Sequence, residues 1–324
     1  MILSYMKPPY KITNDILKLV VRISEKLGEI NASHLYKPTT ELRKKNRIKT
    51  IQSSLEIEGN TMTEEQITAI LENKRVVAPQ KDIIEVQNAI KVYEQINEFS
   101  PYQLKDLEKA HAILMNGLLK NAGQLRKTNV GIVKGEKIEH IAPSGEIVKS
   151  LMNNLFDYLK NDEEITLIKS CVFHYEFEFI HPFLDGNGRM GRLWQTLILM
   201  QEYPVFEYLP IESMVKENQT EYYNVLSQSD KMGASTPFIL FMLKMILQSL
   251  EQLLQTQNRT LSATDRVKLY QNIIQDKLFS RKDYLLHFKE ISPTTASRDL
   301  RNAVKQNILS KFGENRLTKY KFNS

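Results

Sequence analysis

The chain has 324 residues, of which 42% are hydrophobic and 25% are charged, as in an ordinary soluble globular protein with room for two or three domains. Its one cysteine, Cys171, excludes an internal disulfide and lies in an apolar run, so we expect a core residue in a cytoplasmic protein. We expect neither a signal peptide nor contact with a membrane, because the start lacks the signal pattern and the apolar run 238–250 is too short to span a bilayer.

The basic residues are unevenly distributed. The last sixty residues hold 13 Lys and Arg against 6 Asp and Glu, whereas the first 264 hold 31 against 32. The whole basic excess therefore lies at the carboxy-terminal end, which indicates a separate module with an acidic partner.

Apolar residues recur at helical spacing along most of the chain, so we expect a mainly α-helical protein. Thr63 and Gln66 form a capping-box pattern at one helix start, and Gly59-Asn60 ends the helix before it. The expected helices cover residues 14–27, 41–56, 64–71, 81–97, 104–118, 149–160, 165–179, 189–201, 218–229 and 237–257.

Ser54 and Glu58 lie four residues apart near the end of the second expected helix, so both side chains project from one face. Glu56 points elsewhere on the same helix. Taken alone, Glu58 is equally compatible with a solvated helix end.

Residues 129–141 break the helical pattern. Val130, Ile132 and Val133 are followed by Gly135, which predicts a short hairpin or flap before Pro143.

The most informative segment is His181-Pro182-Phe183-Leu184-Asp185-Gly186-Asn187-Gly188-Arg189-Met190-Gly191-Arg192. Its two glycines lie at the expected start of a helix, where unpaired backbone N–H groups bind anions, and Asn187 adds side-chain donors. Arg189 and Arg192 would reach separate phosphates.

The same segment supplies groups for chemistry at a phosphate. Asp185 is a hard oxygen ligand suited to a hydrated Mg²⁺, and His181 has a pKa suited to accepting a hydroxyl proton. Each residue also has a purely structural interpretation, since histidines cap helices, arginines form surface ion pairs and glycines form turns.

At every specified position this segment resembles the Fic family signature, H-P-F-x-[D/E]-G-N-G-R-x-x-R. The resemblance implies that His181 deprotonates a Ser, Thr or Tyr hydroxyl of a target protein and that Asp185 holds Mg²⁺. It also implies that Gly186, Asn187 and Gly188 form an anion hole for ATP, with Arg189 and Arg192 on the remaining phosphates and Arg192 on the γ-phosphate. The expected product is a protein carrying AMP.

Three further segments resemble parts of the same family. Ser54 to Gly59 fits the inhibitory pattern [S/T]-x-x-x-E-[G/N], which implies that Glu58 pairs with Arg192 and displaces the γ-phosphate; in some members this glutamate also supports AMP removal. Tyr222 and, more weakly, Asp230 would contact the nucleotide, although core packing explains both tyrosines of Tyr222-Tyr223 nearly as well. Ile132, Val133 and Lys134 would align a target segment by strand addition.

The carboxy-terminal residues resemble a winged helix-turn-helix. Residues 255–265 are polar and read as a linker, 281–307 as helix, turn and helix, and 307–309 with 316–320 as wing strands turned at 313–315. Such a module binds DNA, or serves as a protein-docking or dimer module, so DNA and a homodimer are both expected partners.

We therefore expect an amino-terminal helical region with the inhibitory helix (1–100), a Fic-type helical bundle with a β-hairpin flap (101–258) and a winged helix-turn-helix (265–324). The expected activity is protein adenylyl transfer from ATP and Mg²⁺, restrained by Glu58, with the protein itself as one candidate acceptor. The alternatives are transfer of another phosphate-containing group, and a DNA-binding regulator with a dormant or sensory core.

Overall fold

A computed structural model describes residues 6–32, 40–134, 137–260, 262–275, 277–289, 291–314 and 318–323. These residues form two compact units. The larger contains the described residues up to Ser249 except 29–32, and the smaller contains 29–32 together with the described residues from Leu250 onward. The expected division at residue 100 stays a prediction.

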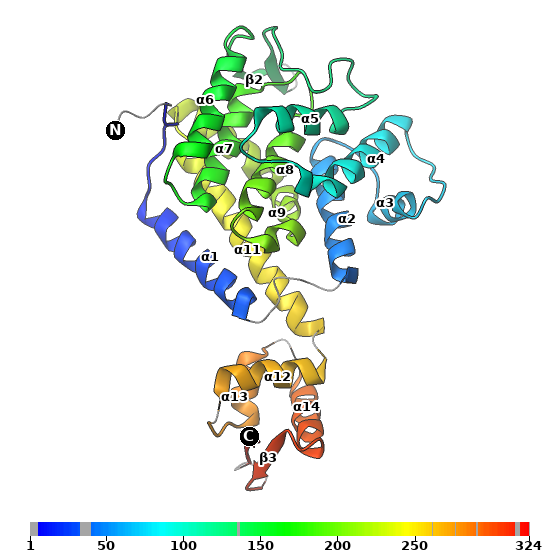
Figure 1. The fold of residues 1–324 in the computed structure, drawn as a ribbon, viewed down its shortest axis with the longest axis vertical. Helices are drawn as coiled ribbons and strands as arrows, with labels where there is room; N and C mark the ends of the chain where they lie inside the picture. Colours follow the sequence, from blue (N-terminus) through cyan, green and yellow to red (C-terminus); the bar gives the residue numbers. More distant parts are fainter. Residues whose placement is uncertain are drawn as a thin grey trace. The chain divides into compact units, whose positions relative to one another are not determined.

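The expectation of a mainly helical protein is confirmed, with one short hairpin in the larger unit (Figure 1). The helices and strands up to the unit boundary are α1 (Asn14–Ala32), α2 (Thr40–Ile57), α3 (Glu64–Leu71), α4 (Gln80–Glu94), η1 (Ile96–Glu98), α5 (Leu104–Leu114), β1 (Gly131–Lys134), β2 (Lys137–Ile141), α6 (Val148–Asn161), α7 (Thr166–Ile180), α8 (Asn187–Met200), η2 (Pro204–Tyr208), α9 (Ile211–Glu217), α10 (Gln219–Met232) and α11 (Thr236–Thr260).

The helices α7 and α8 form the centre of this unit and pack against each other. Both are buried along most of their length, and Phe173, Phe177 and Trp194 are fully enclosed. Cys171 lies in the same core, where burial raises the pKa of its thiol to about 12, so it is confirmed as a core residue. Because α7 and α8 are consecutive, the loop between them is held at both ends by the core.

The helices α2 and α4 bring amino-terminal residues to α8. Helix α2 packs on α8, α9 and α4, and Ser53 of α2 contacts Ser213 of α9 at 3.1 Å between the hydroxyl oxygens. The capping box of Thr63 and Gln66 at the start of α3 is confirmed. Gly59 ends α2 with φ of 90°, the left-handed conformation that favours glycine, as its position predicts.

The hairpin expected within 129–141 is confirmed. Strands β1 and β2 pair antiparallel, with Gly131 opposite Ile141 and Lys134 opposite Lys137, and the register shifts between Ile132 and Val133. The backbone of the predicted target flap therefore lies in β1, whereas its side chains lie outside the described part of the structure.

The smaller unit contains α12 (Ala263–Ile274), α13 (Arg281–His287), α14 (Pro293–Lys305), β3 (Leu309–Phe312) and β4 (Lys319–Phe322). The two strands pair antiparallel, and Phe279, Tyr284, Phe288 and Leu300 lie in a core of their own. A buried ion pair joins Arg266 of α12 to Asp299 of α14 at 2.7 Å. From α13 onward the order of helix, helix and two strands is the expected one, whereas α12 was not expected, and the winged-helix assignment stays a prediction.

The structure departs from the expected elements in three places. The linker expected at 255–265 is wrong, because α11 continues to Thr260 and α12 begins at Ala263 behind a capping box of Ser262 and Asp265. Helix α9 was not expected. The apolar stretch of α11 is longer than the sequence suggested: Thr236–Thr256 is long and apolar enough to cross a membrane, but 61% of its most apolar window is buried inside the protein, as in a core helix.

Candidate active site

The loop between α7 and α8 begins and ends in left-handed backbone. His181 closes α7 with φ of 50° and ψ of 60°, and Gly186 precedes α8 with φ of 83°. A left-handed conformation is free for glycine but unfavourable for histidine, and such conformations persist where the surrounding contacts enforce them.

Arg126 supplies those contacts at the end of α7. Its side chain donates to the carbonyl oxygens of Ile180 at 2.9 Å and His181 at 2.7 Å, and its backbone N–H donates to Pro182 at 2.8 Å. The last carbonyls of a helix lack partners within it and carry the negative end of the helix dipole. A buried guanidinium therefore satisfies them and fixes the backbone of the candidate base.

The same guanidinium contacts both sides of the hairpin. It donates to the carbonyl oxygen of Thr128, before β1, and to that of Pro143, after β2, each at 2.7 Å. Arg126 thus joins the backbone of His181 to the base of the hairpin expected to receive a target.

His111 of α5 holds the middle of the loop. Its ring stacks on Phe183 with centroids 3.6 Å apart, and its Nδ1 accepts the N–H of Gly123 at 2.7 Å. Nε2 therefore carries the proton and donates to the carbonyl oxygen of Asp185 at 2.9 Å. Burial lowers the pKa of His111 to about 4, which keeps this neutral tautomer at physiological pH.

Asn187 braces the loop instead of pointing its amide into open space. Its Oδ1 accepts the N–H of Phe183 and its Nδ2 donates to the carbonyl oxygen of the same residue, both at 2.9 Å. The Asn187 side chain therefore fixes the loop backbone, and its place in the anion hole, on the α-phosphate in the family, stays a prediction.

Arg192 points from α8 toward the end of α2. Its NH2 donates to Glu58 Oε1 at 2.7 Å and to the carbonyl oxygen of Ser54 at 2.9 Å, while its Nε lies 3.1 Å from Ser54 Oγ. The Arg192 side chain is only 2% exposed and Glu58 is 31% exposed. Burial, the largest single effect, lowers the pKa of Arg192, but Glu58, Tyr222 and Glu178 together raise that pKa above its usual value.

Gly188 creates the space in which the Glu58 carboxylate lies. A β-carbon at this position would stand 2.5 Å from Glu58 Oε1 and 3.1 Å from NH1 of Arg192. The carboxylate therefore lies at the start of α8 beside a guanidinium, which is where a phosphate would be expected.

These residues open onto a cleft of about 200 Å³. It brings together the predicted residues His181, Gly188, Arg192, Tyr222 and Asp230 with Glu58. The full lining consists of Glu58, Glu178, Phe179, His181, Gly188, Arg192, Tyr222, Tyr223, Leu226, Ser227 and Asp230.

Tyr222 is fully buried, and its hydroxyl lies 3.1 Å from Nε2 of His174, so this phenol belongs largely to the core. Its neighbour Tyr223 is half-buried and also lines the cleft. Asp230 accepts a hydrogen bond from the Tyr175 hydroxyl at 2.9 Å. Tyr223 is therefore an additional candidate for contact with a bound ring.

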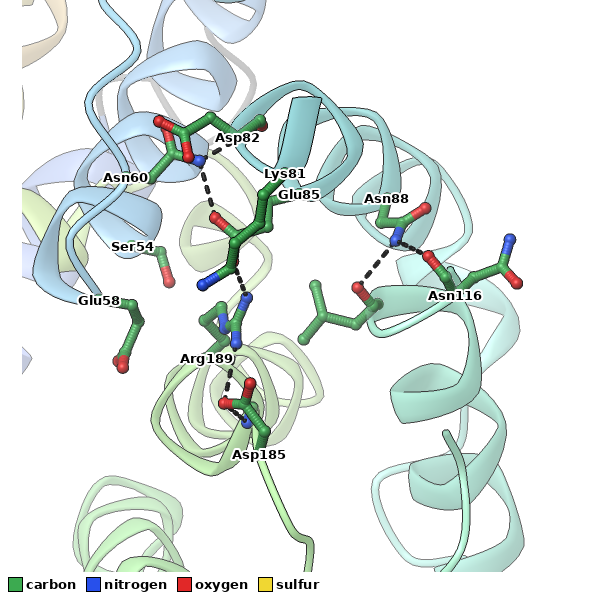
Figure 2. Close-up of polar contacts among 12 residues, drawn as sticks. Ser54, Glu58, Asn60, Lys81, Asp82, Glu85, Asn88, Asn116, Asp185 and Arg189 are labelled. Atoms are coloured by element: carbon green, nitrogen blue, oxygen red, sulfur yellow. Dashed lines mark hydrogen bonds and ion pairs between the residues drawn. The ribbon is translucent and has the colours of Figure 1, made fainter. Parts of the chain in front are cut away.

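Asp185 and Arg189 lie outside this lining. Asp185 is 58% exposed, and its Oδ1 accepts from its neighbour Gly186 N–H at 2.6 Å and from Arg189 NH2 at 3.2 Å. Arg189 is buried and also donates to Glu85 Oε1 of α4 at 3.1 Å (Figure 2). The described residues contain no cluster of three metal-ligating side chains. One exposed carboxylate suits Mg²⁺, which keeps several waters and takes further ligands from substrate phosphates.

The chain matches the Fic/DOC family over residues 101–199. It is also similar to the crystal structure of a Fic family protein from Desulfovibrio desulfuricans G20, with 38% identity and a TM-score of 0.76, covering 98% of this chain and 99% of that one. The chain belongs to the Fic family.

Fic relatives from animals match a smaller share of their own length. Protein adenylyltransferase Fic from Nematostella vectensis is 30% identical over 243 residues, which are 71% of this chain and 54% of that protein. Protein adenylyltransferase fic-1 from Caenorhabditis elegans is 28% identical over 207 residues, which are 60% and 38%. The chain thus spans about half or less of the length of these curated relatives.

The residues that sequence reasoning missed at this Fic site act on the loop from other elements. His111, Arg126 and Glu85 precede the motif by 55 to 96 residues and belong to no recognisable short motif. The sequence offers only a general signal for them: an arginine or histidine that becomes buried must have a polar partner.

We expect His111 to make stability fall with acidity. Unfolded histidine binds a proton near pH 6.5, whereas folded His111 does so only near pH 4, so the unfolded state binds more protons in between. On lowering the pH from 7 to 5, the wild type should lose about 2 kcal/mol more than His111→Gln in urea unfolding. Subtracting the two plots of unfolding free energy against pH removes the contribution of other titrating groups. The same pH dependence in both proteins would contradict the lowered pKa of His111.

Replacing Arg126 by Lys should destabilise the protein, because one ammonium cannot reach the carbonyls on both sides of the loop. We expect the free energy of unfolding in urea to fall by about 2–4 kcal/mol, the range for a broken buried polar network. Lys127→Ala, at the exposed neighbouring residue, is the control and should change it by less than about 0.5 kcal/mol. Equal stabilities of the two variants would mean that the Arg126 contacts are dispensable.

Proposed function

We propose that this protein transfers AMP from ATP–Mg²⁺ to a Ser, Thr or Tyr hydroxyl of a protein, and that Glu58 restrains the reaction. The relatives named protein adenylyltransferase support the reaction class. The cleft supports it as well, because a histidine, a helix amino terminus and a buried arginine converge there.

The proposed chemistry is an in-line displacement at the α-phosphorus. The acceptor oxygen bonds to phosphorus, the bond to the pyrophosphate oxygen breaks, and His181 takes the hydroxyl proton. The N–H groups at the start of α8 would stabilise the charge on the phosphoryl oxygens, and Arg192 would bind the γ-phosphate. Asp185 would hold Mg²⁺, which offsets charge on the phosphates.

One observation carries this proposal: the Glu58 carboxylate lies against Gly188 and Arg192, in the place that a phosphate would take. With Glu58 there, the γ-phosphate lacks its arginine and the nucleotide cannot be aligned for attack. The same contact therefore supports both the proposed anion site and the proposed restraint.

The acceptor would be a segment of a cytoplasmic protein, or of this protein itself. Hairpin β1–β2 offers backbone groups for strand addition, and Arg126 links its base to His181. Transfer of another phosphate-containing group on the same fold is the alternative. ATP labelled at the α-phosphate or at the γ-phosphate distinguishes AMP transfer from this alternative, according to which label is found on the protein.

The smaller unit supports a second candidate function, binding of duplex nucleic acid. On α14, Ala296, Leu300 and Ala303 face the core. Arg298, Arg301 and Lys305 of the same helix are exposed. The adjacent hairpin adds further exposed lysines at Lys311, Lys319 and Lys321. An exposed row of cations on one helix and its hairpin suits phosphate contacts. A regulator with a dormant or sensory Fic core would use this surface without any transfer.

Removing the Glu58 carboxylate should activate transfer. With ATP labelled at the α-phosphate and Mg²⁺, Glu58→Gly should label protein at least about tenfold more than wild type, equivalent to about 1.4 kcal/mol. Adding His181→Ala should abolish the label while ATP binding persists.

The matched control is Glu56→Gly, which makes the same change two residues earlier, inside α2, but breaks a pair with Lys216 instead. Its labelling should stay within about twofold of wild type. Equal activation by both glycines would attribute the effect to a loosened helix. Label from γ-labelled ATP alone would replace AMP transfer by phosphate transfer.

The nucleic-acid proposal predicts a salt-dependent affinity carried by α14. Arg298→Glu/Arg301→Glu should weaken binding to a fluorescent duplex and reduce the slope of log K against log salt by about 2. Lys18→Glu/Lys105→Glu changes the charge equally at exposed positions of the larger unit and should leave the slope unchanged. An unchanged slope in the α14 variant would locate any nucleic-acid binding elsewhere.

A further inference from the structure

Arg189 joins two carboxylates that come from distant parts of the chain. Its NH1 donates to Glu85 Oε1 at 3.1 Å and its NH2 to Asp185 Oδ1 at 3.2 Å (Figure 2). Arg189 and Glu85 are buried, with side chains 5% and 7% exposed, whereas Asp185 is 58% exposed. The Arg189 guanidinium therefore connects the buried carboxylate of Glu85 to the exposed carboxylate of Asp185.

Glu85 is itself fixed by the segment that follows Glu58. Asn60 donates from Nδ2 to Glu85 Oε2 at 2.8 Å, and its own Oδ1 accepts the N–H of Met62 at 3.0 Å. Lys81 approaches the same carboxylate at 3.9 Å from the exposed side of α4. Each oxygen of Glu85 thus has a defined partner.

Helix α4, which carries Glu85, is fastened on both sides. Asp82 accepts from the N–H and the hydroxyl of Thr61 at 3.2 and 2.9 Å. One helical turn beyond Glu85, Asn88 donates to the carbonyl oxygens of Leu114 and Asn116 at 3.1 and 2.7 Å. These contacts hold the Glu85 carboxylate in place relative to α8 (Figure 2).

We propose that Glu85 is a positioning residue for Asp185, acting through Arg189; this inference rests on the proposed function, in which Asp185 holds the metal. Glu85 engages NH1 and offsets part of the guanidinium charge, while the buried Nε of Arg189 has no hydrogen-bond partner among the described residues. The carboxylate of Asp185 then accepts one hydrogen bond from the guanidinium, beside that from the N–H of Gly186, instead of being drawn into a two-point pair with Arg189. It keeps its exposure and its charge for a cation.

Without the Glu85 charge, the buried Arg189 would have Asp185 as its remaining counterion. The guanidinium and the Asp185 carboxylate then favour a pair with two parallel hydrogen bonds, and this pair competes with a metal ion for the same carboxylate oxygens. Partners behind a metal ligand typically change metal affinity by 10- to 100-fold. Arg189 is accordingly assigned to the support of Asp185, and the phosphate contact expected for it stays a prediction.

Metal binding in Glu58→Gly tests this without relying on turnover. Mn²⁺ is titrated into protein saturated with α,β-methylene-ATP, and free Mn²⁺ is followed by its electron paramagnetic resonance signal. Adding Glu85→Gln should raise the Kd for Mn²⁺ about tenfold or more, and adding Glu85→Asp, which keeps the charge, should raise it less. Affinity for the analogue without metal should stay within twofold.

The matched control is Glu94→Gln, which neutralises an exposed carboxylate of the same helix nine residues after Glu85 and should leave the Kd for Mn²⁺ within twofold. Melting temperatures verify that each variant is folded, and Glu85→Asp carries the test if Glu85→Gln is not. An unchanged Kd for Mn²⁺ in the folded Glu85 variant, equal losses in the Glu94 control, or no Mn²⁺ binding in Glu58→Gly would overturn the proposal. Weakened Mn²⁺ binding in a protein that transfers no AMP would uphold the positioning role and reject the proposed function instead.

Discussion

The burial of two guanidinium groups on α8 is the constraint on which the rest of the site depends. A buried cation is tolerated only with a partner close by, because leaving water costs several kcal/mol per ion. Arg192 takes its partners from the end of α2 and Arg189 takes one from α4. The amino-terminal helices are therefore electrostatic parts of the site as well as packing partners, and in the proposed function a carboxylate already occupies the anion site.

The backbone carbonyls of the loop between α7 and α8 likewise need partners, because they are polar groups removed from water. The carbonyls of Ile180, His181 and Pro182 all accept from Arg126, and the carbonyl of Asp185 accepts from His111. Backbone groups at a helix end would otherwise remain unpaired in a poorly solvated place. Arg126 and His111 thus shape the motif by donating to the carbonyl oxygens within it and just before it.

The sequence predicts well the features that depend on neighbouring residues. The helical spacing, the capping box at Thr63 and the hairpin before Pro143 are found where the pattern places them, because each depends on residues only a few positions apart. Helix α9 is too short for a periodic signal, and the polar stretch after Gln255 was mistaken for a linker although most of it is helical. The support of Asp185 by Arg189 and Glu85 could not be predicted, since the pairing of charges 104 residues apart is decided by tertiary packing.

Because Glu58 is part of the same chain as Arg192, the proposed function makes it an intramolecular competitor of the nucleotide, with an effective concentration set by how firmly α2 is held. In the proposed function, the apparent affinity for ATP is the intrinsic affinity multiplied by the fraction of molecules in which Glu58 has left Arg192. A contact such as that between Ser53 and Ser213, which joins α2 to α9 away from the cleft, would then set nucleotide affinity. Any ligand that loosens the packing of α2 would act on this protein in the way that a higher ATP concentration does.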